Sequence, residues 1–158
     1  MTGVQTCALP ISPVFAEIRE EVYGAGNGTG PEDEIGDVLY NRGVANSAFV
    51  VEAMSTAMKE FGDKVLTGDE MQWGFEHLDI TPERIAELGL TGVIPPTKVT
   101  CSNHEGSPAI KLQRWDGEKW TIFTDWIPGM TDLTRPLVEA DAAQYAQENG
   151  ITPRDCTS

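Results

Sequence analysis

The residues with the most reactive side chains lie in one short segment, Cys101-Ser-Asn-His104. A cysteine and a histidine at this spacing can supply two of the four ligands of a zinc ion, and the same pair can act as a nucleophile and its base. Only His77 and scattered carboxylates remain to complete a zinc site, and none of them stands at ligand spacing. On a strand or loop, two side chains three residues apart point in unrelated directions. We therefore expect neither a bound metal nor cysteine catalysis.

A disulfide is the second possible role of Cys101, with Cys156 near the end of the chain as its partner. In an oxidising compartment the two sulfurs would pair. Closing a loop of about 55 residues would stabilise the fold by about 4 kcal/mol in the chain-entropy treatment. In a reducing compartment both would remain free thiols, and the spacing alone leaves both possibilities open.

Two other patterns have ordinary structural explanations. The glycine-rich segment 24–30 does not follow a strand, lacks a terminal Lys-Ser/Thr and is followed by three acidic residues, so we expect a connecting loop and not a phosphate site. The tryptophans at 115, 120 and 126 could form a platform for a carbohydrate. However, cross-strand packing in a hairpin accounts for Trp115 and Trp120 without any ligand.

The charge of the chain excludes some classes of partner. It carries 25 acidic and 11 basic residues, for a net charge of −14. Such a field repels nucleic acid and anionic membrane surfaces, and no cluster of Lys or Arg offsets it locally. The longest apolar runs, such as residues 48–51, are too short to span a bilayer. We expect a soluble, monomeric protein that binds no nucleic acid and holds no cofactor.

Helices are predicted for the part of the chain up to residue 89. Hydrophobic periodicity indicates a helix over Pro13–Tyr23 and a long, well-buried helix over Val38–Phe61 that ends at Gly62. The buried face of the long helix is predicted to hold Val44, Ala48, Val51, Met54/Ser55, Met58 and Phe61. Thr67-Gly-Asp-Glu70 has the form of a capping box and opens a helix to about Leu78, and Thr81-Pro82 opens another that ends at Gly89.

Extended structure is predicted after residue 91. Pro95-Pro96 forces an extended crossing within Gly92–Cys101, with a strand at Lys98–Cys101. Ala109–Trp115 and Trp120–Trp126 form a hairpin around Asp116-Gly117, and a tail helix follows over Pro136–Asn149. A two-stranded hairpin is marginal by itself, so this order of elements looks incomplete without further strands.

The first eleven residues, MTGVQTCALPI, resemble the translation of a common sequencing adapter. They also lack the marks of a secretory signal, because no basic residue precedes Arg19 and Pro10 interrupts the apolar run. We therefore treat residues 1–12 as a non-native start and leave Cys7 out of the cysteine pairing. The natural protein is expected to continue upstream of Ser12, including its own signal peptide.

Several ordered motifs carry a resemblance to a known family. They are Val51-Glu-Ala-Met54, Ile94-Pro-Pro-Thr-Lys-Val-Thr-Cys101, His104-Glu-Gly-Ser107, Gln113-Arg-Trp-Asp-Gly-Glu-Lys-Trp120, Thr124-Asp-Trp126, Arg135-Pro-Leu-Val-Glu-Ala140 and Gly150-Ile-Thr-Pro-Arg-Asp-Cys156. Between about Pro13 and Cys156 the chain resembles the C-terminal region of the Leu/Ile/Val-binding (type I) periplasmic substrate-binding proteins of ABC transporters. Each motif is weak alone, whereas their order and spacing are fairly specific.

The resemblance implies an α/β fold, as the C-terminal fragment of a two-lobe receptor that is more than twice this length. Residues 13–91 would be part of the second lobe, 92–101 the last hinge crossing, and 102–158 a hairpin and tail helix that pack on the first lobe. The protein would bind a branched-chain amino acid or a similar small polar solute without being an enzyme. It would lie in the oxidising periplasm, which favours the disulfide, and deliver its solute to a membrane permease.

The resemblance also suggests where this chain would touch the solute. Family members often carry Tyr-Asp-Ala at the start of the long second-lobe helix, but Val44-Ala45-Asn46 stands there in this chain. Tyr40, Asn41 and Arg42 lie just upstream and could supply a ring, an amide and a carboxylate-binding fork. They could equally pack the helix entry. The alternatives for the whole chain are a ligand-sensing domain of a regulator on the same fold and a hydrolase that uses Cys101 and His104.

Overall fold

The computed structural model describes residues 12–118 and 120–156. The predicted non-native start lies outside these residues except for Ser12. Ser12 is buried, and its Oγ donates a hydrogen bond to Gly89 O at 2.5 Å. Ser12 therefore belongs to the folded part of the chain, because its hydrogen bond joins the start of the first helix to the residues that follow the helix Pro82–Glu87.

Seven helical segments and four short strands follow in sequence among the described residues. Helix α1 (Pro13–Glu17) runs into the π-helical η1 (Ile18–Tyr23), and a 3-10 turn η2 (Glu32–Glu34) precedes the long α2 (Val38–Phe61). The remaining elements are α3 (Gly68–Glu76), β1 (Asp79–Ile80), α4 (Pro82–Glu87), β2 (Thr97–Lys98), β3 (Gln113–Trp115), β4 (Trp120–Ile122) and α5 (Thr131–Asn149). β1 pairs with β2 and β3 with β4, both antiparallel.

The local signals in the sequence fix most helix ends. Thr67 and Glu70 form both hydrogen bonds of the predicted capping box, and Thr81 Oγ1 accepts from the N–H of Arg84 at the start of α4. Gly62 follows α2 with a φ of 87°, which side-chain-bearing residues rarely adopt. The predicted bounds of the long helix are confirmed, and α3 is confirmed with an end two residues earlier than predicted.

The tail helix and the strands differ from the prediction. α5 begins at Thr131, five residues earlier than predicted, because the N–H groups of Leu133 and Thr134 already close a turn on Met130 O. Pro136 lies inside this helix. The predicted strand at Lys98–Cys101 is displaced to Thr97–Lys98, where it pairs with β1, a strand that the periodicity did not predict. The hairpin is confirmed with shorter strands, and a bridge between Ile110 and Ile127 extends it.

The hydrophobic core lies where α2, α3 and α4 meet the β1–β2 pair. Its buried members are Ala53, Leu78, Ile80, Ile85, Leu90 and Ile94, and Val44, Ala48 and Phe49 pack against it. The predicted buried face of α2 is therefore only partly right. In the second half of α2 the buried residues are Ala53 and Ala57, whereas Val51 is 59% exposed. α3 packs against the small residues of α2 because they allow the two backbones to approach closely.

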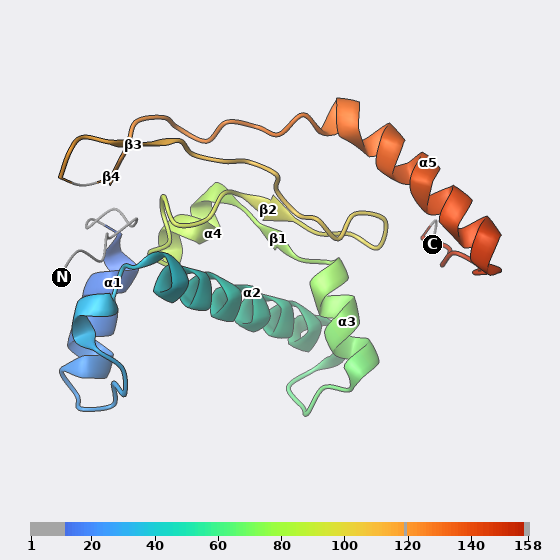
Figure 1. The fold of residues 1–158 in the computed structure, drawn as a ribbon. Helices are drawn as coiled ribbons and strands as arrows, with labels where there is room; N and C mark the ends of the chain where they lie inside the picture. The colour runs from blue at the N-terminus through green and yellow to red at the C-terminus, as the bar shows by residue number, and fades with distance from the viewer. Residues whose placement is uncertain (1–11, 119, 157–158) are drawn as a thin grey trace.

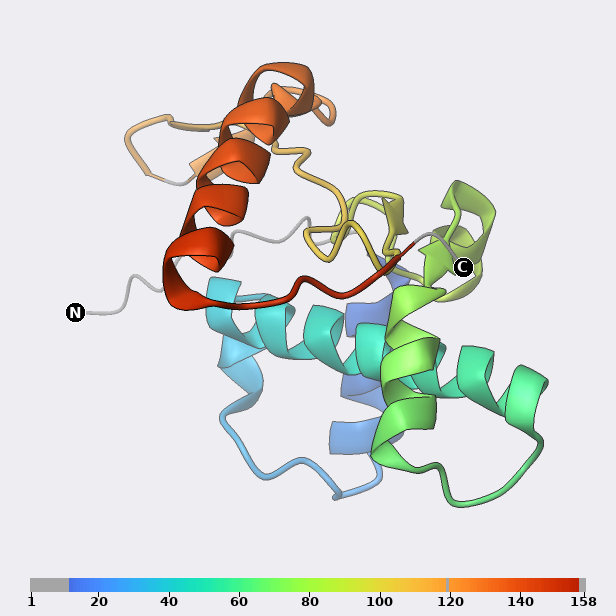
Figure 2. The ribbon, with the colours of Figure 1, turned by 90° about the vertical axis from the view of Figure 1, so that its right-hand side faces the viewer.

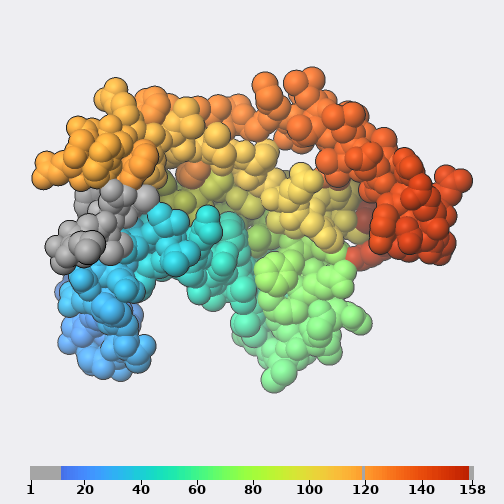
Figure 3. Space-filling model, viewed as in Figure 1, coloured from blue at the N-terminus to red at the C-terminus, as the bar shows by residue number. Residues whose placement is uncertain are grey.

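The molecule has two parts, which we call the core unit (residues 12–100) and the arm (residues 109–150). The arm holds the hairpin and α5 and runs above the core unit as a long bridge (Figure 1). After α5, the segment from Ile151 to Cys156 turns back under the helix toward α3 (Figure 2). The space-filling view shows open gaps between the arm and the core unit (Figure 3).

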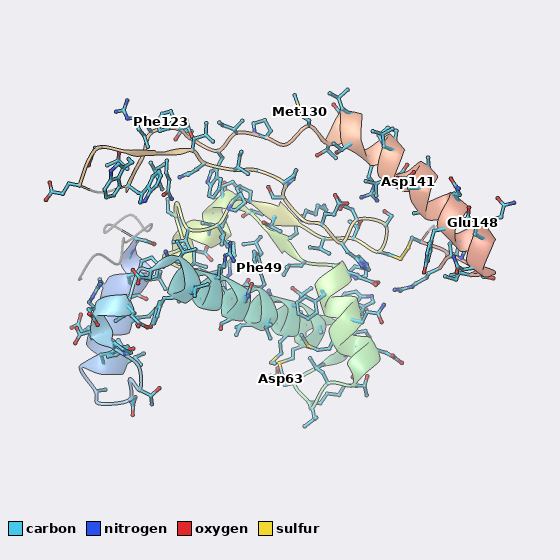
Figure 4. The ribbon with its side chains drawn as sticks, viewed as in Figure 1. Phe49, Asp63, Phe123, Met130, Asp141 and Glu148 are labelled. Atoms are coloured by element: carbon cyan, nitrogen blue, oxygen red, sulfur yellow. A yellow bond between two sulfur atoms is a disulfide. The ribbon has the colours of Figure 1, made fainter. Side chains whose placement is uncertain are left out.

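The arm contributes no described residue to the core. α5 has no buried residue, and no residue of β3 or β4 is buried. Large apolar side chains on the arm are instead exposed, namely Ile110, Leu112, Trp115, Trp120, Phe123, Ile127, Met130, Leu133, Leu137, Val138 and Tyr145. Phe123 and Met130 mark two of these positions along the arm in Figure 4. Among the described helices, none has both the length and the apolar character needed to cross a membrane.

An ion pair ties α4 to α2. Arg84 donates to both carboxylate oxygens of Glu52, from Nε at 2.9 Å and from Nη2 at 2.7 Å. These hydrogen bonds lower the pKa of the Glu52 carboxyl, against the opposing effect of its burial. Because the pKa is lowered in the folded protein, the pair stabilises the fold above the ordinary pKa of glutamate, and this stabilisation is lost as the pH falls through the lowered value.

Glu52→Gln is accordingly expected to lower the free energy of unfolding by about 1 kcal/mol at pH 7, a modest value because Arg84 is partly exposed. The difference from the wild type should shrink as the pH falls below the ordinary pKa of glutamate and through the lowered pKa of Glu52, because the carboxyl then becomes protonated in the folded chain as well. Urea unfolding of both proteins at pH 7 and at a series of lower pH values measures this difference in the free energy of unfolding. Glu60→Gln, at an exposed position of the same helix, is the control. A loss of stability in Glu52→Gln that did not depend on pH would contradict the stabilising role of the ion pair with Arg84.

Candidate functional site

Tyr40, Asn41 and Arg42, the predicted solute contacts, all lie within the first five residues of α2. Successive residues of a helix project about 100° apart, so the three side chains leave the axis in different directions. Tyr40 lines a hollow of about 420 Å³ together with Ile18, Gly43, Val44 and Ser47. Burial, together with Tyr23 and its hydrogen bond, raises the pKa of the Tyr40 phenol, which is therefore neutral at pH 7.

Asn41 presents an acceptor that lacks a donor within the described chain. Its Nδ2 donates to Gly36 O at 2.8 Å, which fixes the orientation of the amide. Its Oδ1 is buried and receives no hydrogen bond from the described residues, and the same holds for Oδ1 of Asp37 one helical turn earlier. Buried acceptors without donors are rare in folded proteins, and they suit a ligand or water that donates hydrogen bonds.

The structure thus brings Tyr40, Asn41 and Asp37 to the entry of α2, whereas the side chain of Arg42 is exposed. Asp37 was missed by sequence reasoning. It occupies the N-cap position of α2, yet its side chain makes no capping hydrogen bond. An aspartate directly before a helix is ordinarily interpreted as a cap, so no signal in the sequence separates this case from the usual one.

The second candidate pair, Cys101 and Cys156, forms a disulfide with the two Cα atoms 5.5 Å apart. The pairing predicted for an oxidising compartment is thereby confirmed. With its sulfur in this bond, Cys101 has no thiol to act as a nucleophile or a zinc ligand. Within residues 12–118 and 120–156, no three His, Cys, Asp or Glu side chains are grouped closely enough to hold a metal ion.

Glu76 is the functional candidate that sequence reasoning overlooked. It ends α3, and its side chain is only 4% exposed. Its Oε1 accepts from Gln72 Nε2 at 2.8 Å and from Arg154 Nη1, and it lies 3.4 Å from His104 Nε2. The hydrogen bonds from Gln72 and Arg154 outweigh burial and lower the pKa of the Glu76 carboxyl. A buried, ionised carboxylate therefore joins α3, the 101–108 loop and the tail.

A larger pocket lies beside this carboxylate, and we call it the crossing pocket. Its volume is about 720 Å³, and it is formed by α2, α3, the segment 94–99 and the loop 104–109. Its apolar wall includes Phe49, which projects from α2 toward the strands in Figure 4. Binding sites for small molecules generally have a volume of this order, a mostly apolar wall and a few polar groups, and the crossing pocket shares these features. His104 lines this pocket with 63% of its side chain exposed.

Comparison with known proteins gives one informative match. No protein-family model and no curated protein matches the chain. A solved structure from the Pseudomonas fluorescens group, described as an ABC transporter permease, is 35% identical in sequence and superposes with a TM-score of 0.89. The match covers 95% of this chain but only 36% of that one. In sequence and in fold, the chain is therefore similar to about a third of an ABC transporter component.

Proposed function

We propose that the chain is part of a two-lobe solute receptor of the type I periplasmic binding protein class, serving an ABC importer. The similarity to an ABC transporter component supports a role in transport. The receptor would bind an amino-acid-like solute without changing it covalently and release it to a membrane permease. In this proposal the core unit belongs to one lobe, and segment 92–101 is a crossing between lobes.

The exposed apolar surface of the arm is the observation that carries the proposal. A hairpin and a 19-residue helix with no buried residue among those described lack the packing that normally stabilises such elements. The side chains along the arm nevertheless include isoleucine, leucine, phenylalanine and tryptophan of the kind that fill cores, and Met130, Leu133 and Leu137 are the most exposed apolar residues among them. A second lobe that packs against this surface would account for it, as monomeric proteins rarely expose apolar patches of this extent.

Two further features fit a receptor outside the cytoplasm. The disulfide between Cys101 and Cys156 is of a kind that persists in oxidising compartments such as the periplasm. At the entry of α2, the Tyr40 ring and the acceptor oxygens of Asp37 and Asn41 offer contacts for a solute that donates hydrogen bonds, such as one with an ammonium group. This site is separate from the crossing pocket.

A chimera tests the proposal. Residues 12–156 of this chain replace the matching segment of the Pseudomonas protein, so that the rest of that chain supplies the remaining two thirds. The chimera is expected to be a soluble monomer that binds a member of a panel of amino acids in calorimetry. Binding should weaken at least tenfold in Asn41→Ala and Tyr40→Ala, because both remove proposed solute contacts.

Gln147→Ala in α5 serves as the matched control, since it removes an exposed amide that lines neither this hollow nor the crossing pocket. A folded chimera that binds none of the panel would contradict the receptor role. A chimera that dissolves only in detergent would instead favour the membrane component that the neighbour's description names.

A further inference from the structure

The residues that line the crossing pocket favour one chemical class of ligand. Phe49, Phe75, Leu78, Ile94 and Val99 give it an apolar wall, and Glu76 is the buried charged group within it. Glu105 adds a second carboxylate to the lining, and the described lining residues include no lysine or arginine. An anionic group of a ligand would therefore face two carboxylates and no lysine or arginine of the lining, while a cationic group would meet a carboxylate.

The geometry of Glu76 leaves one of its oxygens for a ligand. Gln72, Arg154 and His104 all approach Oε1. Oε2 of the same carboxylate can accept a further hydrogen bond, and hydrogen bonds between a charged donor and a charged acceptor are roughly twice as strong as neutral ones. Arg154 reaches Glu76 from the tail with 57% of its side chain exposed, so its charge is partly screened by solvent.

From this arrangement we infer that the crossing pocket binds a small aliphatic amine, with its alkyl group against Phe49, Phe75 and Ile94 and its ammonium on Oε2 of Glu76. The inference does not rest on the receptor proposal, because every residue involved belongs to this chain and the site is remote from Tyr40 and Asn41. Arg154 on Oε1 neutralises part of the charge of Glu76 and repels a second cation, so the tail opposes binding and does not assist it.

Titration of the 158-residue chain with 3-methylbutylamine, followed by amide chemical shifts in NMR, tests the inference. Saturable shifts are expected around the pocket, with the neutral 3-methylbutan-1-ol and the anionic 4-methylpentanoate binding at least tenfold more weakly. Glu76→Gln keeps the shape and a hydrogen-bonding group but removes the charge, and it should weaken amine binding about tenfold. Arg154→Gln should strengthen it severalfold, because it removes the repelling cation.

Asp69→Asn is the matched control, as it removes one negative charge from the exposed first turn of the same helix. It should change the affinity less than twofold if the site and not the net charge of −14 attracts the amine. Ala109→Leu should abolish binding by filling the pocket without touching Glu76. Equal affinity for the amine and the alcohol, or equal effects of Glu76→Gln and Asp69→Asn, would overturn the inference.

Discussion

Reduction of the disulfide between Cys101 and Cys156 is expected to release the arm while the core unit stays folded. The bond closes a loop of 55 residues, and the chain-entropy treatment assigns it about 4 kcal/mol, or roughly a thousandfold in the opening equilibrium. The other contacts that hold α5 to the rest of the chain are polar contacts of arginines that are at least partly exposed. Arg135 donates to Ser102 O and pairs with Glu105 at one end, and Arg154 pairs with Glu76 beyond the other. Contacts of arginines that are partly in solvent contribute little compared with the disulfide.

Hydrogen–deuterium exchange measures this release segment by segment. Without the disulfide, amides of α5 should approach the exchange rate of an unstructured peptide, because a helix with no buried face is only marginally stable. Amides of α2 and α3 should keep their protection, since the buried residues from Ala53 to Ile94 all lie in the core unit. The double substitution Cys101→Ser and Cys156→Ser should give the same pattern without reductant.

Cys7→Ser is the control, because it removes the third cysteine and leaves the pair intact. Thiol titration in denaturant should find one thiol in the oxidised wild type and three after reduction. Protection of α5 that survived reduction would show that packing and not the disulfide holds the arm. Three thiols in protein purified under oxidising conditions would mean that the disulfide does not form.

Local chemistry explains why the helices were predictable. Thr67 with Glu70, Thr81 with Pro82, and Gly62 act within one turn of the helix ends that they define, so a single sequence carries the whole signal. β1 could not be found in this way. It has two residues, Asp79 and Ile80, and it exists because Thr97 and Lys98 return alongside it after the intervening helix α4.

The candidate sites depend on contacts between distant parts of the chain, and these were largely unpredictable. Glu76 is buried because Arg154, 78 residues later, is brought back to it by the tail. Nothing near Glu76 in the sequence distinguishes it from the exposed carboxylates around it. The disulfide was predictable because few cysteines were available to pair, whereas the acceptor oxygens of Asp37 and Asn41 depend on the backbone path at Gly36.

The buried face of α2 shows the same limit. Periodicity marked the large residues, including Val51, as the buried face, but α3 crosses α2 where Ala53 and Ala57 face Gly74. Three small residues at one contact allow two helices to approach more closely than large ones would, and a hydrophobicity pattern gives small residues little weight. Substitutions at the contact between Gly74 and Ala53 and Ala57 can therefore measure how much close packing of α2 and α3 contributes to the stability of the fold.

Gly74→Ala is expected to lower the free energy of unfolding by about 2 kcal/mol. A Cβ at position 74 would lie 2.3 Å from Ala53 O and 3.0 Å from Ala57 Cβ. The first neighbour is a backbone atom of α2, so the strain is relieved only if α3 moves as a whole. Overpacking of this kind costs roughly 1–3 kcal/mol, against which the higher helix propensity of alanine offsets up to about 1 kcal/mol.

Gly43→Ala separates packing from propensity. Gly43 also lies inside a helix, but a Cβ there meets no heavy atom within 4 Å, so only the propensity gain of about 1 kcal/mol should remain. The two variants are thus expected to differ by about 3 kcal/mol in urea unfolding, with opposite signs relative to the wild type. If both were stabilised alike, α3 would not pack on α2 through Gly74. The β1–β2 pair, which follows directly from α3, would then lack the support that positions the crossing pocket.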